Sequence, residues 1–441
     1  MICILAVFFV PLSSGICSEE YDYINIAEPF THKIPVAIPV FKALSEGSTQ
    51  ERVAQKSADM MQEALAYTGY FKMIDRGAFL VEPAEQEIVT DKIDFGSWTD
   101  IGAELLITGG VRMEAGVLQM EFRLFDPFRQ EMLLGKRYTG KPENQRSMVL
   151  RFCGEVIKRL TGKAGLFKSR IAFVGSAGDS GTSGNGGKAV YVCDFDGKNI
   201  KQVTESQDIV VSPAWGRENR FLAYTAYSDS HPNIYITDLD SGETSRFAAY
   251  KGINITPQWV PGSSGLAATL SFEGDEDIYL LTDTGKIDKR LTKSWGVDVS
   301  PTFSPDGEKM AFVSNRSGSP QLYVMDMKSG SIRRLTYEGE YNTQPEWSPV
   351  EDKIVYSGMK KGRTDIYVID VGTGEISRLT RDGGNNEAPS WSPDGSMIVF
   401  SSTRNGPSRL FVMTASGTDQ RMLLEMPGQQ KLPDWSSPAG K

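Results

Sequence analysis

Residues 388–395 read Ala-Pro-Ser-Trp-Ser-Pro-Asp-Gly, and the Pro-x-aromatic core of this segment returns every 44 residues through the C-terminal part of the chain. The prolines are Pro213, Pro257, Pro301, Pro345, Pro389 and Pro433, and the aromatic residues two places on are Trp215, Trp259, Phe303, Trp347, Trp391 and Trp435. Three more columns keep the same interval: Tyr224, Ala268, Phe312, Tyr356 and Phe400; Tyr191, Tyr235, Tyr279, Tyr323, Tyr367 and Phe411; Val203, Phe247, Leu291, Leu335, Leu379 and Leu423. Five columns in one register indicate an internal repeat.

An interval of about 40 to 45 residues is typical of one blade of a β-propeller, which holds four short strands and their turns. Within each unit, apolar and β-branched runs such as 353–357 and 365–370 are separated by turns. One separator is Ser-Pro-Asp-Gly, in which Pro presets φ and Gly accepts a positive φ. The pattern therefore predicts four strands per blade, which we letter A to D starting from the Pro-x-aromatic strand.

The two ends of the repeat region predict how the ring closes. The region begins with a B-like strand at 170–174 and finishes with an A-like strand at 432–435, so the two pieces complete one blade. This predicts six blades, of which five are continuous. Such closure pairs strand edges that would otherwise be exposed.

The repeated aromatic residues have a structural and a functional interpretation. Identical placement in every blade is what packing between neighbouring blades requires, so we expect core residues rather than platforms that stack on a ligand. The aspartates that follow strand C are likewise expected to cap turns rather than to act as catalytic acids.

The chain divides into four predicted parts. Residues 1–18 predict a signal peptide, because the apolar run is too short to span a bilayer. Residues 19–162 lack the repeat and predict a mixed α/β domain, 163–169 a linker, and 170–441 a propeller closed by the C-terminal strand. The predicted fold class is therefore a small N-terminal mixed α/β domain followed by a six-bladed β-propeller. No later segment is apolar enough to be transmembrane.

Local signals in the first domain predict alternating strands and helices. Residues 34–41 read as a buried strand. Ser48 and Glu51 form a capping box that opens a helix ending at Gly69. The last helix of the domain is expected to stop at Gly162.

Composition argues against several kinds of site. A net charge of −9 argues against nucleic acid or an anionic membrane as the main partner. His32 and His231 are the only histidines, so we expect no histidine-based metal site and no cofactor. The Gly/Ser-rich residues 176–187 lack the Gly-Lys-Ser/Thr ending of a P-loop. Beyond the signal peptide, Cys153 and Cys193 fall in different domains, and we expect free buried thiols rather than a bridge.

The order of the domains and the residue pattern of the repeat resemble those of the TolB family of Gram-negative envelope proteins. The repeats read Trp-Ser-Pro-Asp-Gly-x-x-Ile/Met-Ala/Val-Phe, Leu/Ile-Tyr-Val-x-Asp and Arg-Leu-Thr. The resemblance covers nearly the whole mature chain, including Gly-Tyr-Phe-Lys at 69–72 and the join at 165–172. The repeat alone is less specific, because similar blades occur in oligopeptidases and polysaccharide lyases. Departures at 259–265 and in the first blade affect turns.

The resemblance implies a non-enzymatic, monomeric, periplasmic protein of the Tol–Pal system. TolB-like proteins bind Pal, the peptidoglycan-associated lipoprotein, through the propeller. They bind the C-terminal domain of TolA through the mature N-terminal segment. Their roles are outer-membrane integrity, cell division and protein import.

The resemblance also points to partner-binding residues. Pal-contacting residues lie just before the blade proline, which indicates Ile253, Thr256 and Val299. By geometry alone, the patch extends to neighbouring loops between strand D and the next strand A, at Asn342, Thr343, Asn385 and Asn386. The alternative is that these are ordinary solvated turn residues.

The TolA-binding segment would be residues 19–26. Its alternation of Tyr21 and Tyr23 with Ile24 and Ile26 suits the addition of a strand to a partner's sheet. An edge strand of its own domain is equally compatible with this pattern.

The alternative function is a periplasmic propeller enzyme, either peptidase-like or a polysaccharide lyase. A serine hydrolase of the α/β type needs Gly-x-Ser-x-Gly, which the chain lacks. A lyase that uses histidine would have only His231 in the repeat region. The sequence therefore favours a protein that binds other proteins.

Overall fold

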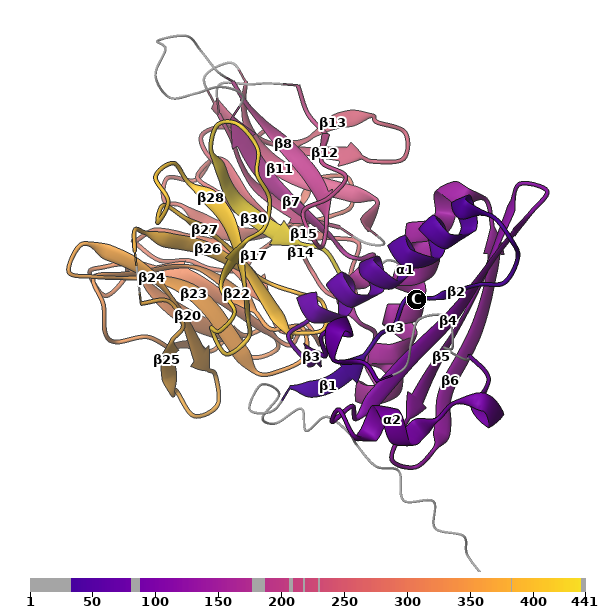
Figure 1. The fold of residues 1–441 in the computed structure, drawn as a ribbon. Coiled ribbons are helices and arrows are strands. Elements are labelled where there is room, and N and C mark those ends of the chain that lie inside the picture. The colour runs from indigo at the N-terminus through magenta and orange to yellow at the C-terminus, as the bar shows by residue number, and fades with distance from the viewer. Residues whose placement is uncertain are drawn as a thin grey trace, which may run out of the picture.

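The computed structural model describes residues 33–80, 88–176, 187–205, 209–216, 219–228, 231–381 and 383–437. The expected signal peptide, the segment 19–26 with Tyr21, Tyr23, Ile24 and Ile26, and most of the Gly/Ser-rich stretch lie outside these ranges. The described chain forms an α/β domain beside a six-bladed propeller (Figure 1). The predicted fold class is confirmed.

The α/β domain is one mixed sheet, with α1 and α3 on one face and the short α2 packed against the other. Its elements are β1 (Ile34–Ala37), β2 (Lys42–Ala43), α1 (Ser48–Tyr67), β3 (Phe71–Met73), η1 (Arg76–Ala78), η2 (Thr90–Lys92), α2 (Phe95–Thr99), β4 (Leu105–Glu114), β5 (Val117–Asp126), β6 (Glu131–Gly140), η3 (Pro142–Asn144) and α3 (Gln145–Thr161), followed by η4 (Leu166–Lys168). The strand order is β3-β1-β4-β5-β6, and β2 pairs with β4. Helices α1 and α3 lie between the sheet and the propeller (Figure 1).

Local chemistry explains where the helices begin and end, with one correction. The capping box is wrong: Gly47 occupies the N-cap position, no side chain caps the helix, and Ser48 is already its first residue. Glu51 lies in the first turn, where its charge suits the helix dipole. Both helices end as predicted, with Gly69 at φ +77 and Gly162 at φ +72, a conformation that glycine adopts without steric cost.

The expected strand at 34–41 is shorter in the structure: only Ile34–Ala37 form β1, and β2 follows beyond the run at Lys42–Ala43. Both pair in parallel with β4, and β1 also pairs with β3. Pro39 lies between them and has no N–H to donate to a ladder. The apolar run is therefore buried throughout, although only parts of it are strand.

The propeller consists of six four-stranded antiparallel sheets. Blade 1 is β10 (Val210–Trp215), β11 (Phe221–Ser228), β12 (His231–Asp238) and β13 (Thr244–Ala248); blade 2 is β14 (Asn254–Trp259), β15 (Leu266–Leu270), β16 (Asp277–Leu281) and β17 (Ile287–Arg290); blade 3 is β18 (Asp298–Phe303), β19 (Lys309–Ser314), β20 (Gln321–Asp326) and β21 (Ile332–Arg334). Blade 4 is β22 (Tyr341–Trp347), β23 (Lys353–Lys360), β24 (Arg363–Asp370) and β25 (Ile376–Arg378); blade 5 is β26 (Asn386–Trp391), β27 (Met397–Ser402), β28 (Arg409–Thr414) and β29 (Arg421–Met422); blade 6 is β30 (Gln430–Trp435) with β7 (Arg170–Ser176), β8 (Lys188–Asp194) and β9 (Lys201–Gln202).

A separate hydrophobic cluster fills each seam between neighbouring blades among the described residues. The strand-A aromatic residue belongs to the seam with the preceding blade: Trp347 packs with blade 3 and Trp391 with blade 4. The strand-C tyrosine stacks on the strand-B aromatic residue of its own blade, as Tyr367 does on Tyr356 with ring centroids 5.6 Å apart. The structural interpretation of these columns is confirmed.

The repeated Arg-Leu-Thr has a distinct task for each residue, as blade 4 illustrates. Arg378 donates from Nη2 to Asp365 Oδ2 at 2.5 Å. Leu379 packs in the seam with blade 5. Thr380 Oγ1 accepts from the Ile366 N–H at 2.9 Å and donates to Asp365 Oδ1 at 2.9 Å. The motif therefore anchors the short strand D to the start of strand C and satisfies a buried carboxylate.

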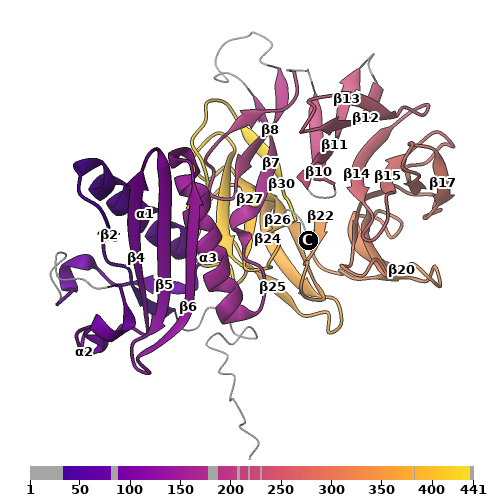
Figure 2. The ribbon, with the colours of Figure 1, turned by 90° about the vertical axis from the view of Figure 1, so that its right-hand side faces the viewer.

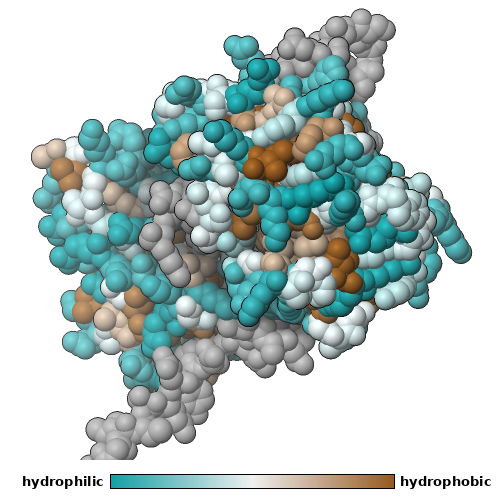
Figure 3. All heavy atoms as spheres, turned by 180° about the vertical axis from the view of Figure 1, so that it is seen from behind, coloured by the Kyte–Doolittle hydropathy of each residue, from teal (hydrophilic) through white to brown (hydrophobic). Residues whose placement is uncertain are grey.

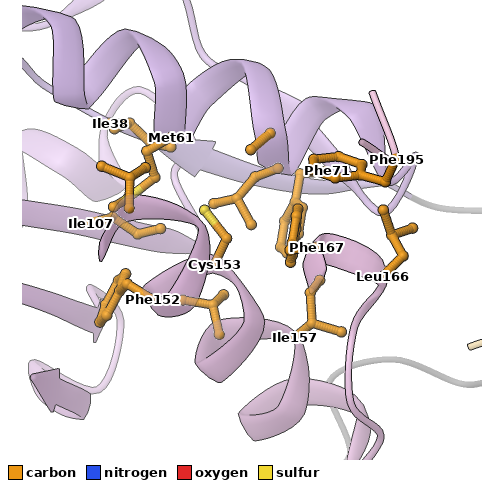
Figure 4. Packing of buried hydrophobic residues seen from close by; sticks show 14 of the residues in the cluster. Ile38, Met61, Phe71, Ile107, Phe152, Cys153, Ile157, Leu166, Phe167 and Phe195 are labelled. Carbon is orange, nitrogen blue, oxygen red and sulfur yellow. The ribbon is translucent and has the colours of Figure 1, made fainter. Parts of the chain in front are cut away.

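The ring closes where β30 pairs antiparallel with β7. Trp435 Nε1 donates to Ser169 Oγ at 2.7 Å, and the Arg170 N–H donates to Ser436 Oγ at 2.8 Å. The hydrophobic cluster at this seam is continuous with the core of the α/β domain, as Phe167 and Phe195 beside the helices show (Figure 4). The closing seam and the α/β domain therefore share one core.

Cys153 and Cys193 both lie in this shared core, in α3 and β8, and both are buried free thiols. Burial raises the pKa of each thiol well above its ordinary value. The prediction of two free buried cysteines is confirmed.

Replacement of a seam tryptophan should destabilise the propeller. Trp391 is only 4% exposed, so Trp391→Ala should lower the free energy of unfolding by about 3 to 5 kcal/mol through lost burial and a cavity. The matched control is Trp295→Ala, because Trp295 is 78% exposed and its removal should cost within about 0.5 kcal/mol. Chemical denaturation of both variants measures the difference, and equal losses would contradict the assignment.

Removal of the closing strand should have a larger effect. Deletion of residues 431–441 leaves the edge of β7 unpaired and opens the shared core. We expect early melting and aggregation, measured by thermal scan and light scattering. A soluble truncated protein with an unchanged melting temperature would show that ring closure is not required.

Candidate partner-binding face of the propeller

The loops of the propeller lie on two opposite faces. Loops from strand D to the next strand A meet the B–C loops, and the Ser271 N–H donates to the Ile253 carbonyl at 3.1 Å. A–B turns meet C–D turns, and the Val371 N–H donates to the Asp352 carbonyl at 2.9 Å. We call these the D–A face and the A–B face.

The α/β domain contacts the A–B face, at the C–D turns of blades 5 and 6. Arg421 Nη2 donates to the Tyr67 carbonyl at 2.7 Å, and its guanidinium lies 4.3 Å from the centroid of the Tyr67 ring. Tyr67 Oη donates to the Phe195 carbonyl at 2.8 Å, and Arg146 Nη2 lies 2.9 Å from Asp196 Oδ1. The two views of the ribbon agree with this arrangement (Figures 1 and 2). These contacts leave the D–A face available to a partner.

Five of the predicted Pal-contacting residues lie in the D–A ends of the inner strands, and two lie in the loops directly before them. Ile253 and Asn385 directly precede β14 and β26; Thr256 lies in β14, Val299 in β18, Asn342 and Thr343 in β22, and Asn386 in β26. The sequence predicts strand A of blade 5 at 389–392, starting at its proline. In the structure a bulge carries the strand across the proline, as the register shift between Ile255 and Gln258 shows.

The bulge gives each blade a non-glycine residue with positive φ immediately before the proline. These residues are Ser212, Thr256, Ser300, Gln344, Ala388 and Leu432, with φ between 50 and 54. They surround the D–A mouth of the central channel, a cavity of about 130 Å³. Thr256 Oγ1 lies 3.0 Å from Thr269 Oγ1 and 3.4 Å from the Ser300 N–H of the next blade. Thr256 is thus held at the rim of this mouth.

Asn342 and Asn386 do not belong to the accessible face, because they are 3% and 0% exposed. Asn342 Nδ2 donates to the Glu338 carbonyl at 2.7 Å, and Asn386 Nδ2 donates to Asp365 Oδ1 at 3.2 Å. They belong to a further repeat column of buried polar residues, Asn254, Asp298, Asn342, Asn386 and Gln430. Sequence analysis missed this column, whose 44-residue interval was the sign of a structural role.

The D–A face carries large aromatic side chains that sequence analysis overlooked. Trp295, Tyr337 and Tyr341 are 78%, 72% and 49% exposed, and they lie in or at the end of the loops that enter blades 3 and 4. We call them the aromatic rim. Each is present in only one blade at its repeat position, so packing between blades does not require it. Their presence in a single blade was the sequence feature that could have identified them.

The B–C loop of blade 3, residues 315–320, connects the members of the rim. The Val297 N–H donates to Asn315 Oδ1 at 2.8 Å, and the Asn342 N–H donates to the Pro320 carbonyl at 3.0 Å. The segments that carry the rim are therefore joined across two blades. Elsewhere, the face of the molecule seen in Figure 3 is largely hydrophilic with a few separate hydrophobic patches. Tryptophan and tyrosine side chains are enriched at protein–protein interfaces.

The residue between Pro and the aromatic residue forms the narrow waist of the channel. Its side chain can accept a hydrogen bond from the backbone N–H of the aromatic residue in the next blade. The four bonds of this kind run from Trp347 to Thr302 Oγ1 at 3.1 Å, from Trp391 to Glu346 Oε1 at 3.1 Å, from Trp435 to Ser390 Oγ at 2.8 Å and from Trp215 to Asp434 Oδ2 at 2.7 Å. On the A–B side of the waist, a second cavity of about 360 Å³ is bordered by the tryptophans. The waist therefore joins neighbouring blades by hydrogen bonds.

Two of these waist residues are carboxylic acids deep inside the ring. Burial raises the pKa of Asp434 to about 7, against the lowering effect of the Trp215 N–H. Burial and the nearby charge of Asp434 raise the pKa of Glu346 well above its ordinary value. The two acids titrate as a pair.

The described residues contain no group of three or more His, Cys, Asp or Glu side chains placed to hold a metal ion. No helix in the described part of the chain is long and apolar enough to cross a membrane.

Comparison with known proteins assigns the family. Residues 157–439 match the family profile described as the TolB beta propeller domain, and residues 22–133 match the TolB amino-terminal domain. The chain belongs to the TolB family. A "Tol-Pal system protein TolB" of Desulfosudis oleivorans is 52% identical over 234 residues, which is 53% of this chain and 50% of that protein. Another, of Syntrophus aciditrophicus, is 37% identical over 212 residues, 48% of this chain and 46% of that protein. The chain thus spans about half the length of these curated relatives.

Solved structures support the same family. The crystal structure of TolB from Acinetobacter baumannii matches with a TM-score of 0.80 and 25% identity, over 92% of this chain and 97% of that one. A chain of Kuenenia stuttgartiensis hydrazine synthase matches with a TM-score of 0.51 and 14% identity, over 62% of this chain and 47% of that one. The second likeness concerns the fold alone, and it shows that a related fold also occurs in an enzyme.

Stability should depend on pH through the waist. A carboxyl whose pKa is higher in the folded than in the unfolded state stabilises the protein at low pH. This stabilisation is lost as pH rises through the pKa of the folded state. Asp434→Asn retains an oxygen acceptor but no charge, so it should be more stable than wild type at pH 8 by about 1 to 3 kcal/mol. Chemical denaturation between pH 4 and 8 should show a smaller decrease in the free energy of unfolding for the variant than for wild type. Parallel profiles would contradict the raised pKa.

Proposed function

We propose that the chain is a non-enzymatic periplasmic adaptor of the Tol–Pal system. Its propeller would bind a Pal-like lipoprotein through the D–A face. Its mature N-terminal segment, residues 19–26, would bind a TolA-like inner-membrane protein. In this role it would maintain outer-membrane integrity and support cell division.

The observation that carries the Pal part of the proposal is the arrangement of the two faces. The α/β domain occupies turns on the A–B face, whereas the D–A face presents the aromatic rim next to Thr256 and Val299. Tryptophan and tyrosine are enriched among the residues that contribute most to protein–protein binding. An open face with exposed aromatic residues on a rigid ring is suited to a folded partner.

Individual residues would contribute in different ways. Ile253 and Val299 are half-buried, and Val299 packs against the seam between blades 3 and 4, so their exposed surface is held rigidly. Asn385 is exposed, and its backbone bonds Thr403, which fixes a polar edge. Thr343 is half-exposed in β22. Such a rigid surface loses little conformational freedom when a partner binds.

Two large, charged side chains introduced at the rim of the channel mouth test the proposed face. Thr256→Arg combined with Val299→Arg should weaken binding of the soluble domain of the organism's own Pal-like lipoprotein by more than about thirtyfold, or about 2 kcal/mol. Isothermal titration calorimetry measures the affinity. Thermal melting confirms that the variant is folded.

The matched control places the same residue types on the A–B face. Thr284→Arg combined with Val350→Arg changes exposed turn residues and should leave the affinity within about twofold of wild type. A second variant, Trp295→Ala with Tyr341→Ala, should weaken binding without a change in melting temperature. If both D–A variants are folded and bind like wild type, the assigned face is wrong.

The alternative of a peptidase or a polysaccharide lyase has no specific observation in its favour among the described residues. His231 is the only described histidine and lies exposed at the start of β12. Assays with peptides and acidic polysaccharides, run beside the Pal titration, distinguish the two classes. Turnover by the purified protein without Pal binding would replace the adaptor proposal.

A further inference from the structure

Strand β6 has the longest unpaired edge in the described structure. It contains ten residues and pairs only with β5, so its outer backbone groups have no strand partner. The other sheet edges are shorter: β3 has three residues, and the outer strands of the propeller blades have between two and five. Figure 2 shows β6 at the border of its sheet, with α3 beside it. Proteins usually shorten or cover such edges, because they can accept a further strand.

Positive charge lines this edge on the side of α3. The exposed cations are Lys136 in β6, Lys141 just after it, and Arg151, Lys158 and Arg159 in α3. None of these side chains forms an ion pair in the described structure. Glu155 is the acidic residue among the α3 cations, and Glu131 and Glu143 lie at the two ends of β6. The flank is therefore net positive on a chain with a net charge of −9.

Two of the α3 cations reach across to β6. The Arg151 guanidinium lies 5.6 Å from the centroid of the Tyr138 ring. Arg159 Nε donates to the Leu133 carbonyl at 3.4 Å, and its terminal nitrogens bond no other described residue. Leu133 and Tyr138 are five residues apart on β6. The guanidinium groups thus stand beside the free edge at two points along its length.

We propose that the free edge of β6 is a docking site for an extended, acidic peptide segment of a partner protein. The segment would add a strand to the sheet through backbone hydrogen bonds. Because successive side chains in a strand point to opposite faces, every second residue would face α3. Carboxylates at those positions would meet Arg151 and Arg159, whose planar donors suit carboxylate oxygens.

The apolar end of β6 would set the position of the peptide. Phe128, in the turn before β6, is 63% exposed, and Met132 near the start of the strand is 46% exposed. An apolar residue at one end of the peptide would cover these side chains. A lipid surface would also be attracted by the cations, but it would not use a row of strand hydrogen bonds. The backbone edge therefore favours a peptide over a membrane.

The test uses the full-length protein and synthetic decapeptides in which glutamate alternates with valine. Fluorescence anisotropy at low salt should show binding of this peptide and none of its lysine–valine counterpart. A third peptide keeps the glutamates but carries N-methyl groups on all of its backbone amides, which blocks both of its edges. It should bind at least about tenfold more weakly, because it cannot donate to a strand edge.

Charge variants identify the site. Arg151→Glu combined with Arg159→Glu should weaken binding of the glutamate peptide at least about tenfold. The control, Lys201→Glu combined with Lys289→Glu, makes the same change of charge on the outer strands β9 and β17 and should bind like wild type. Thermal melts verify that both variants fold. Neither measurement involves Pal, so the outcome is independent of the function proposed for the D–A face.

Three results would overturn the proposal. The first is equal binding of the N-methylated peptide, which would mean attraction by charge alone. The second is equal loss in the two pairs of variants, which would mean a general effect of net charge. The third is binding only to vesicles containing anionic phospholipid, with no binding of the peptide, which would make the flank a membrane-facing surface.

Discussion

The pairing of β30 with β7 is the interaction on which the rest of the structure depends. It joins residues 430–435 to residues 171–175, so the last part of the chain completes blade 6 and leaves no open side in the ring. The seam that it closes is continuous with the core of the α/β domain, through Phe167, Phe195 and the buried faces of α1 and α3. Ring closure and domain docking therefore rely on the same buried surface, and we expect the two domains to unfold together. The ion pairs and hydrogen bonds around Tyr67 and Arg146 then fix the angle at which they meet.

The inner strands combine three tasks in a few residues. The aromatic residue fills the seam with the preceding blade, the residue before it bonds the next blade, and the bulge at the proline shapes the mouth of the channel. Glu346 and Asp434 perform the second task with groups that are costly to bury in charged form. Ser390 and Thr302 perform the same task without charge. The repeat therefore does not require acidic residues at these two positions of the waist.

The molecule offers surfaces of different chemistry in different directions. The A–B face is partly covered by the α/β domain, and the D–A face presents a rim of aromatic residues. The flank of β6 and α3 is basic, whereas the chain as a whole is acidic. A rigid body with several distinct surfaces can hold more than one partner at a time, which suits an adaptor better than a single deep pocket would.

The sequence by itself determined the propeller, its six blades, its closure and the structural role of the repeated aromatic residues, because a 44-residue interval records packing that every blade must satisfy. It also determined the ends of both long helices, where Gly69 and Gly162 supply a positive φ. Only the tertiary structure decided which residues near the prolines are exposed on the D–A face. Asn342 and Asn386 look like polar loop residues in the sequence, yet they are buried because the inner strands continue past the bulge. Likewise, the exposure of Trp295 and the cations beside β6 depend on which loops and helices lie side by side. Such proximity arises between residues far apart in the chain, and no local pattern encodes it.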